Sequence, residues 1–289
     1  VSQGTPICRT LVLHPVESIW YQISQIMSFE LIGRHSRLVK EIKRLDSPSH
    51  RLETGRFLVE GIRVVEELLS SDLDIVHLLI SERLLASEIA QWAEEVKRKR
   101  PGASVWIAAD SLMQDLSCAK TSQGVLAVVE LPEVKPEDIL QVSRLLVLSQ
   151  VQDPGNVGTL IRSGLAFGFE AALICGGADP FNARAVRSAA GAVFHMPVLR
   201  VDERDLDSWS QDLRDEGFTL ITAEAHGGQN IKDVNFPAKS ALILGAEVKG
   251  VDKSWRSKEH IKVHIPLSAK SESLNVAAAG AVIMYEMAR

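Results

Sequence analysis

The sequence is poor in the features that mark disulfide-bonded, zinc-binding and membrane-spanning proteins. Its 289 residues include 3 cysteines, Cys8, Cys118 and Cys175, which are widely spaced and form no CxxC pair. This pattern argues against a disulfide framework or a structural zinc site and fits a reducing, intracellular compartment. No apolar run approaches the roughly 20 residues that a membrane-spanning helix needs, so we expect a soluble chain without a membrane partner.

The signatures of several common enzyme classes are also missing. No GxGxxG follows the first strand of the C-terminal half, and the chain has no GxxxxGK[ST] and no GxSxG. Dehydrogenases, P-loop nucleotidases and hydrolases with a nucleophile elbow are therefore disfavoured. The 8 histidines show no HExxH or comparable spacing, so we expect no metal site. Because the formal net charge is −5, a surface that binds nucleic acid must be a local patch.

One stretch, residues 34–51, is basic within this acidic chain. Leu38, Ile42 and Leu45 recur there at helical spacing, which leaves the charged side chains on the outer face of a predicted helix. Such a charge run is either a solvated helix face or a surface that follows RNA phosphates, and both interpretations stay open. The cationic residues of this stretch are Arg34, Arg37, Lys40, Lys43, Arg44 and Arg51.

The pattern of apolar runs divides the chain into a tail, two α/β domains and a linker. Residues 1–28 carry only Arg9 and Glu17 as charges, and they are either an unstructured tail or the remnant of an organellar transit sequence. Residues 29–132 alternate strands with helices and predict a small α/β domain, and residues 133–142 predict a linker. The strands expected in this domain are Phe57–Val59, Ile75–Ile80, Val105–Ala108 and Val125–Glu130, with helices over 64–69 and 86–100.

Residues 143–289 repeat a strand, a loop and a helix, which predicts a parallel sheet covered on both faces. Ligands of such sheets bind at the carboxyl ends of the strands. Three loops of unusual composition fall at these ends, over residues 153–158, 245–250 and 267–275. The strands expected here are Leu145–Leu148, Ala171–Cys175, Thr219–Ala223, Ala241–Gly245 and Ile261–Ile265.

The first loop, Asp153-Pro-Gly-Asn-Val-Gly158, opens a helix. The spacing predicts that Val157, Leu160, Ile161 and Leu165 form its buried face. Arg162 lies four residues after Gly158, so its guanidinium stands near a helix N-terminus, which suits a phosphate or a ribose. The alternative is an ordinary turn followed by a solvated arginine.

The other two loops also carry polar groups where a ligand is expected. In Gly245-Ala-Glu247-Val-Lys-Gly250 the two glycines allow backbone to approach a ligand closely, although a hairpin-like turn with an exposed Glu247 would read the same way. In the third loop we predict that Ser273 caps the last helix. Asn275 then has no capping reason to be asparagine, which suggests that its amide binds something.

Together the three loops resemble the motifs of the SpoU/TrmH group of the SPOUT methyltransferases. These enzymes transfer a methyl group from S-adenosyl-L-methionine to a ribose 2′-hydroxyl of RNA. The motifs stand here as residues 153–158 with Arg162, residues 245–247 with Gly250, and residues 265–267 running to 273–276. The N-terminal half resembles the small substrate-binding domain of the family through Phe57-Leu-Val-Glu60-Gly61.

The resemblance implies a trefoil knot in the last third of the chain, which general topology rules disfavour and periodicity does not predict. It also implies a homodimer. The residues that fall on the reactive positions of the family are Asn156, Arg162, Glu247, Ser273 and Asn275. The residues that fall on its cofactor positions are Gly245, Ile265, Leu267 and Leu274.

The sequence defines the RNA substrate less closely than it defines the reaction. Ribosomal RNA is our first expectation because a separate small domain and a basic face at Arg34, Arg37, Lys40, Lys43 and Arg44 suit structured RNA, and transfer RNA stays open. A methyltransferase that acts on a base and a non-catalytic RNA-binding protein on the same scaffold are the alternatives. The location is the cytoplasm or, if residues 1–28 are a transit remnant, a chloroplast or mitochondrion.

Overall fold

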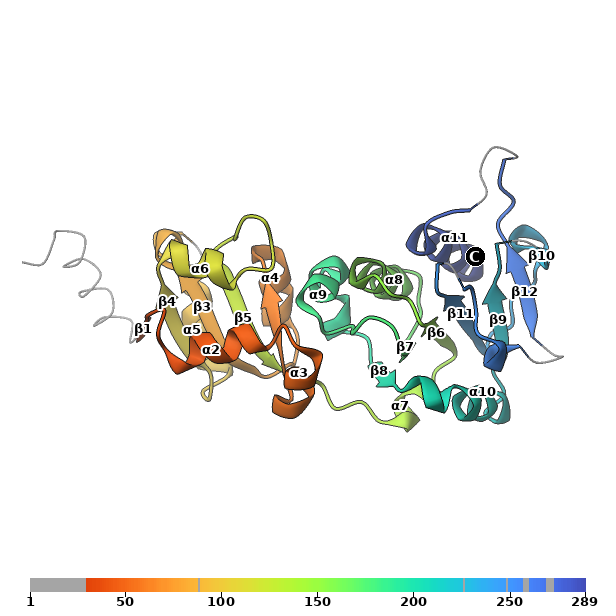
Figure 1. The fold of residues 1–289 in the computed structure, drawn as a ribbon, viewed down its shortest axis with the longest axis horizontal. Coiled ribbons are helices and arrows are strands. Elements are labelled where there is room, and N and C mark those ends of the chain that lie inside the picture. Colours follow the sequence, from red (N-terminus) through yellow and green to blue (C-terminus); the bar gives the residue numbers. More distant parts are fainter. Residues whose placement is uncertain (1–29, 88, 226, 248, 257–259, 269–272) are drawn as a thin grey trace, which may run out of the picture.

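The computed structural model describes residues 30–87, 89–225, 227–247, 249–256, 260–268 and 273–289. The tail predicted over residues 1–28 lies outside this range. The described chain forms an N-terminal and a C-terminal unit that lie side by side along the long axis of the molecule (Figure 1).

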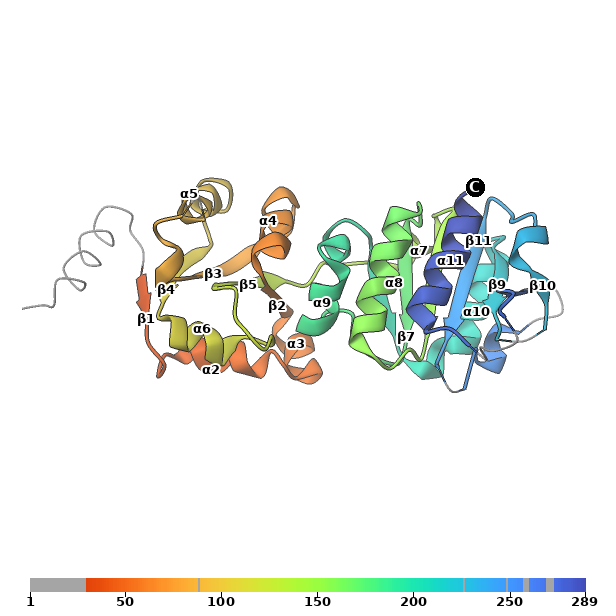
Figure 2. The ribbon, with the colours of Figure 1, turned by 90° about the horizontal axis from the view of Figure 1, so that it is seen from above.

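The N-terminal unit is a mixed sheet between two layers of helices. The sheet has the strand order β1-β4-β3-β5-β2, and β5 runs antiparallel to β2 and to β3. Helices α2, α3 and α6 cover one face, and α4 and α5 cover the other (Figure 2). The strands are β1 (Glu30–Ile32), β2 (Arg56–Glu60), β3 (Ile75–Ser81), β4 (Ser104–Ala108) and β5 (Val125–Glu130), and the helices are α2 (Arg37–Arg44), α3 (Pro48–Thr54), α4 (Ile62–Ser70), α5 (Ala90–Lys99) and α6 (Asp110–Leu116).

The basic stretch differs from its prediction in two ways. It forms two helices, because Pro48 starts α3 in its first turn and Gly55, in the left-handed conformation, ends it. The expectation that Arg51 lies on the outer face is wrong, since its side chain is 1% exposed. Strand β1 and helix α6 were not predicted.

The C-terminal unit is a parallel sheet with the strand order β10-β12-β9-β11-β6-β7-β8, and every recorded pairing in it is parallel. Helices α8, α9 and α11 lie on one face, and α7 and α10 lie on the other (Figure 1). The strands are β6 (Arg144–Ser149), β7 (Ala171–Cys175), β8 (Val198–Val201), β9 (Thr219–Ala223), β10 (Gln229–Asn230), β11 (Ser240–Gly245) and β12 (Ile261–His264), and the helices are α7 (Pro136–Leu140), α8 (Pro154–Ala166), α9 (Ala183–Ala189), α10 (Leu206–Asp215) and α11 (Val276–Ala288).

Strand β6 shows why this sheet is apolar throughout. Its side chains alternate between two cores: Leu146 and Leu148 pack with the α8 and α11 side, and Leu145 and Val147 pack with the α10 side. A strand buried on both faces reads as a continuous apolar run, and the predicted parallel sheet is confirmed. Strands β8 and β10 were not predicted, and the knot stays a prediction.

Residues 133–142, predicted as a linker, include the short helix α7. Its Ile139 is fully buried in the core on the α10 side of the sheet. This connecting segment is therefore packed against the C-terminal unit along part of its length.

The described residues show neither a membrane helix nor a metal cluster. Within them no helix is both long and apolar enough to cross a membrane. Also within them, no group of three or more His, Cys, Asp or Glu side chains is arranged to hold a metal ion.

Candidate active site

Helices α8 and α11 both begin at the edge of the sheet where its parallel strands end. Asp153 caps α8: its Oδ1 accepts a hydrogen bond of 2.9 Å from the backbone N–H of Asn156, and Pro154 follows in the first turn. This cap fixes the start of α8 and turns the Asn156 side chain toward the neighbouring loops.

Hydrogen bonds through Asn156 join the three predicted loops. Its Nδ2 donates to Glu247 Oε1 over 2.9 Å, and its Oδ1 accepts from Asn275 Nδ2 over 3.1 Å. These partners lie 91 and 119 residues away in the sequence. The amide of Asn156 serves at once as donor and acceptor, so three distant segments are held at one point.

The cap of α11 differs from its prediction. Asn275, and not Ser273, is the N-cap residue, because its Oδ1 accepts hydrogen bonds from the backbone N–H groups of Ala277 and Ala278 over 2.9 and 3.3 Å. The capping oxygen orients the side chain so that its amino group reaches Asn156. Asn275 therefore has a capping reason to be asparagine and joins the loops as well.

The loop from Gly245 to Gly250 folds back on its own backbone. A Cβ atom at Gly245 would lie 2.2 Å from the carbonyl carbon and oxygen of Gly250, so no side chain fits there. The backbone N–H of Gly250 donates to Ala246 O over 2.8 Å, and Gly250 has a φ of 68°. Glycine is required here for a tight turn, which places the exposed Glu247 beside Asn156.

Beside this junction lies a pocket of about 360 Å³. All four residues predicted to bind a cofactor line it, and so do Glu247, Ser273 and Asn275 from the predicted reactive set. Apolar side chains from strand β11 and helix α11 form one wall, and the loop residues form the rim. The full lining is Ala223, Glu224, Ala225, Leu244, Gly245, Ala246, Glu247, Gly250, Ile265, Leu267, Ser273, Leu274, Asn275, Val276, Ala279 and Ile283.

Glu224 is a pocket residue that the sequence analysis missed. Its side chain is 18% exposed, and Arg256 lies 3.3 Å from its Oε1. Within the described structure this Oε1 has no hydrogen-bond partner. Its position directly after β9 was the available signal, because the first residues after parallel strands line ligand sites.

Two predicted reactive residues, Arg162 and Ser273, are exposed. Arg162 is exposed on α8, and its side chain has neither a hydrogen bond nor an ion pair with another described residue. Ser273 is exposed on the rim of the pocket. Leu165, predicted on the buried face of α8, is 36% exposed, so that part of the prediction is wrong; Val157, Leu160 and Ile161 are buried as predicted.

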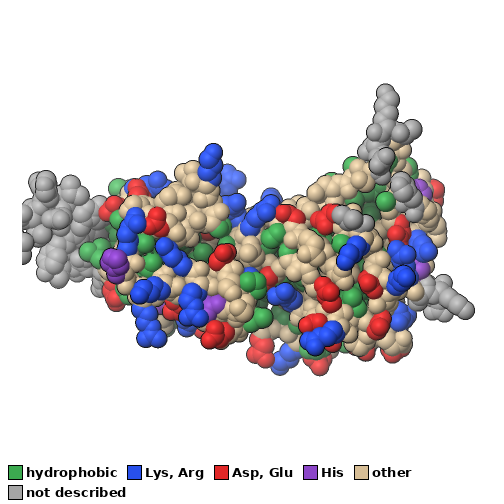
Figure 3. Space-filling view, viewed as in Figure 1, with side chains coloured by type: hydrophobic (Ala, Val, Ile, Leu, Met, Phe, Trp, Pro, Cys, Tyr) green, Lys and Arg blue, Asp and Glu red, His purple; other side chains and the backbone are tan. Residues whose placement is uncertain are grey.

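The predicted basic face is at the surface. Arg34, Arg37, Lys40, Lys43 and Arg44 are all exposed. Figure 3 shows cationic side chains gathered over the part of the N-terminal unit that carries α2 and α3. In Figure 2 these helices lie on the side of the molecule at which α11 begins. The basic helices therefore lie on the same side of the molecule as the start of α11, whose first residues line the pocket (Figure 2).

Comparison with known proteins matches both units to described families. Residues 143–285 match the SpoU rRNA methylase family, and residues 37–127 match the MRM3-like substrate-binding domain. The 23S rRNA (guanosine(2553)-2′-O)-methyltransferase of Bacillus subtilis (strain 168) is 32% identical over 251 residues, which are 86% of this chain and 95% of that protein. The 23S rRNA (uridine(2479)-2′-O)-methyltransferase of Streptomyces viridochromogenes is 29% identical over 269 residues, covering 90% and 91% of the two chains.

One solved structure has the same fold as this chain over most of the length of both proteins. The SpoU methyltransferase AviRb from Streptomyces viridochromogenes, crystallised in complex with AdoMet, superimposes with a TM-score of 0.76 at 27% identity. The superposition covers 88% of this chain and 97% of that one. The N-terminal unit and the C-terminal unit therefore both have a counterpart in that enzyme.

Proposed function

Because the chain belongs to the SpoU rRNA methylase family, we propose that it transfers a methyl group from S-adenosylmethionine to a ribose 2′-hydroxyl of ribosomal RNA. The observation that carries the proposal is the junction of Asn156, Glu247 and Asn275 at the rim of the pocket. The two named relatives act on 23S rRNA, and we propose the same molecule as substrate.

The pocket fits the cofactor in size and chemistry. Its volume of about 360 Å³ lies within the usual range for small-molecule sites. The apolar wall from Leu244 and Ile283 suits a purine ring, and we propose that Gly245, Leu267 and Leu274 contact the polar parts of the cofactor through their backbone groups. When bound, S-adenosylmethionine supplies a methyl group on a positively charged sulfur.

The protein's own contribution is mainly alignment. Asn156, Glu247 and Asn275 hold the three loops so that the pocket and the RNA-facing surface keep a fixed relation. Alignment of this kind accounts for much of the rate gain when two reactants must meet in line. We propose that Ser273, which lies on the rim, contacts the ribose that enters there.

Arg162 is proposed to hold the target ribose through its 2′-oxygen or the adjacent phosphate. Because the described structure leaves its side chain exposed and without a partner, its donors are available to RNA. A guanidinium stays protonated at ordinary pH, so it acts as a hydrogen-bond donor and a fixed positive charge rather than as a general base.

The substitution Arg162→Ala tests this role. We expect methyl transfer to fall about 100-fold or more because a charge-assisted contact made at the reacting centre is lost. Cofactor affinity, measured by calorimetry with S-adenosylhomocysteine, should stay unchanged. The matched control is Arg144→Ala at the start of β6, which should keep wild-type turnover. Full activity of the Arg162 variant would remove this residue from the reaction.

The identity of the substrate is tested by mapping methylated nucleosides. Ribosomal RNA from cells that lack the protein should miss one 2′-O-methyl group, and the purified protein should restore it. A methyl group found on a base would establish the base-modifying alternative. A methyl group found on transfer RNA would show that transfer RNA, and not ribosomal RNA, is the substrate. A protein that binds RNA but not S-adenosylhomocysteine would be the non-catalytic scaffold.

A homodimer is proposed as the assembled form. Leu165 at the end of α8 and Val282 and Tyr285 on α11 are 36%, 41% and 52% exposed. Tyr285 packs edge-on against Phe167 with ring centroids 5.8 Å apart, which makes these helices one apolar surface. An exposed apolar face on two adjacent helices is typical of a subunit interface. For an enzyme with this substrate we also propose an intracellular location, where ribosomes are made.

A further inference from the structure

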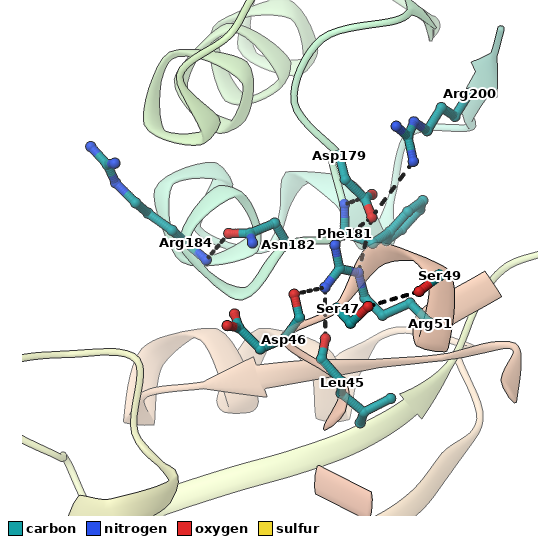
Figure 4. A network of polar contacts seen from close by, with 10 residues as sticks. All are labelled: Leu45, Asp46, Ser47, Ser49, Arg51, Asp179, Phe181, Asn182, Arg184 and Arg200. Atoms are coloured by element: carbon teal, nitrogen blue, oxygen red, sulfur yellow. Dashed lines mark hydrogen bonds and ion pairs between the residues drawn. The ribbon is translucent and has the colours of Figure 1, made fainter. Parts of the chain in front are cut away.

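The two units are joined by a buried ion pair that the proposed reaction does not use. Arg51 of α3 donates from Nε and Nη2 to Asp179 Oδ2 over 2.9 and 2.6 Å (Figure 4). The two side chains are 1% and 8% exposed and lie 128 residues apart in the sequence. Arg200 adds a second positive charge 3.9 Å from the same oxygen.

On the N-terminal side, Arg51 also holds the end of the basic helix. Its Nη1 donates to the carbonyl oxygens of Leu45 and Asp46 over 2.6 and 2.9 Å (Figure 4). Leu45 is the C-cap residue of α2, so one guanidinium binds both the carbonyls directly after α2 and the carboxylate of the other unit. A planar fork with five donors is suited to this double task, whereas a lysine is not.

On the C-terminal side, Asp179 is fixed just before α9. Its Oδ1 accepts from the backbone N–H of Phe181 over 2.9 Å, and the ring of Phe181 packs on Phe57 of β2 with centroids 5.1 Å apart. The ion pair is therefore covered by an apolar contact between the units. Water has little access, so a shifted arrangement would leave charges buried without partners.

Helix α9 continues this path to the reactive loops. A Cβ at Gly158 of α8 would lie 2.1 Å from the carbonyl oxygen of Ala185, which shows how closely the two helices pack. Arg184 of α9 pairs with Asp153 over 3.0 Å, and Asp153 caps α8 at Asn156. Contacts thus run without a gap from the end of α2 to the reactive junction.

We propose that Arg51 and Asp179 are positioning residues that fix the basic face of α2 relative to the reactive loops, so that RNA bound on α2 presents one ribose to Arg162. This inference rests on the proposed function. The physical gain is in effective concentration: a substrate held by two surfaces reacts faster only when the distance between the surfaces matches the substrate. The intact ion pair between Arg51 and Asp179 keeps that distance fixed. Without it the two surfaces would sample a range of distances, few of which match the substrate.

The test compares a long and a short RNA on the full-length protein. The probes are a 23S rRNA transcript and a short fragment around the nucleotide that the wild-type protein methylates, trimmed until wild-type turnover no longer depends on the α2 lysines. The variant Asp179→Asn keeps the shape of the side chain and removes its charge. We expect kcat/KM for the transcript to fall about 10-fold or more, mostly through KM, because the second attachment is lost. Turnover of the fragment and affinity for S-adenosylhomocysteine should stay at wild-type values.

Controls separate positioning from simple loss of structure. Glu95→Gln breaks an ion pair with Lys99 on α5, which covers the other face of the N-terminal sheet. This variant should methylate both the transcript and the fragment at wild-type rates. Arg51→Lys keeps the positive charge but lacks the planar guanidinium group, so we expect a smaller loss of kcat/KM, and only for the transcript. If Asp179→Asn does not fold, the Arg51→Lys variant serves as the test of the positioning role. Spin labels on α5 and α10 should report a broader distance distribution in the variants.

The outcomes are distinct. Equal losses on transcript and fragment, or no loss on either, would overturn the positioning role while leaving the methyltransferase proposal intact. A wild-type protein that methylates neither RNA would instead overturn the proposed function itself.

Discussion

Glu224 shows how a single side chain can complete a pocket. Glu224 lines the pocket, and its buried Oε1 lacks a hydrogen-bond donor among the described residues, although Arg256 lies near enough to balance its charge. Because Glu224 lines the pocket, we expect its carboxylate to accept a hydrogen bond from a bound ligand, such as one from a hydroxyl group of the cofactor's ribose.

We therefore expect Glu224→Gln to weaken the binding of S-adenosylhomocysteine by about 10-fold, the cost of one charge-assisted hydrogen bond. Isothermal calorimetry measures this directly. Glu216→Gln, an exposed carboxylate at the end of α10, serves as the control and should bind normally. Unchanged affinity of the Glu224 variant would mean that this carboxylate does not contact the ligand.

Cys118 is a surface thiol that should nevertheless be unreactive. Partial burial of its sulfur, and then its hydrogen bond to the Glu60 carboxylate, raise the pKa of the Cys118 thiol to about 12. The reactive species is the thiolate, so almost none is present at pH 8. Glu60 itself is 2% exposed and also accepts from Ser117 and from the backbone of Cys118.

Alkylation with iodoacetamide at pH 8, followed site by site by mass spectrometry, should leave Cys118 largely unmodified in the folded protein. The variant Glu60→Gln removes the negative charge beside the thiol and should speed its modification. Modification of Cys118 at the rate of a free thiol in the wild-type protein would contradict the assigned environment.

The residues that the sequence failed to place share a physical cause. The sequence predicted Ser273 and not Asn275 as the N-cap of α11, because serine and asparagine are equally good capping residues and the two lie only two positions apart. Only the observed backbone shows that Asn275 is the cap. Arg51 reads as one more cation in a basic stretch, since its partner Asp179 is distant in sequence. Asn156 and Glu247, by contrast, were brought together correctly because both follow parallel strands that end at the same edge.

At the level of elements, the packing of α8 on α9 depends on one glycine. The Cβ of an alanine at Gly158 would lie 2.1 Å from Ala185 O and 2.8 Å from Ala189 N, both backbone atoms that cannot rotate away. At Gly164 of the same helix the nearest atom would be a methyl group of Leu146 at 3.3 Å, which can move.

Gly158→Ala should therefore destabilise the protein by about 1–3 kcal/mol, the usual cost of overpacking, and should lower activity by shifting Asn156. Gly164→Ala should change stability by about 1 kcal/mol or less, because better helix propensity offsets a mild contact. Urea denaturation of the two variants provides the comparison. Equal stability of the pair would show that α8 and α9 can separate without cost.

Elements were predictable where apolar periodicity was long and unbroken. The strands that became β3, β5, β6, β7, β9 and β11 were each identified within about a residue. Strand β1 and helix α6 were missed because their runs are short, and β8 was missed because Val198 to Val201 includes an arginine. The break between α2 and α3 was missed although Ser47-Pro48 is a helix-start signal.

At the scale of the whole molecule, the proposed dimer interface can be tested by introducing a charge. Tyr285→Glu places a carboxylate within the apolar surface formed by Leu165, Val282 and Tyr285, and should turn the dimer into a monomer because an unpaired charge is costly to bury. Sedimentation velocity measures the mass. Leu52→Glu, at an apolar residue of α3 that is 67% exposed, is the matched control and should leave the dimer intact.

A wild-type protein that sediments as a monomer at all accessible concentrations would rule out the homodimer. If both variants remain dimeric, the interface lies elsewhere on the surface. Neither result changes which residues of this chain line the pocket.

The contact between the two units lay beyond the reach of the sequence. Each unit has its own periodicity, and nothing in either pattern specifies a partner face. The contact forms from scattered side chains, including Arg51, Phe57, Asp179 and Phe181, that are ordinary core or surface types in their local context. Only the folded arrangement shows that they meet.

The order of the pocket residues along the chain has a consequence for synthesis. The N-terminal unit is complete once β5 has left the ribosome, whereas the pocket needs Gly245 and Glu247 and then Leu274 to Ile283. A nascent chain thus acquires its basic face long before its methyl-donor pocket. On the proposed function, we expect a growing polypeptide to bind RNA before it can modify it, and modification to begin only after α11 has emerged and packed against the sheet.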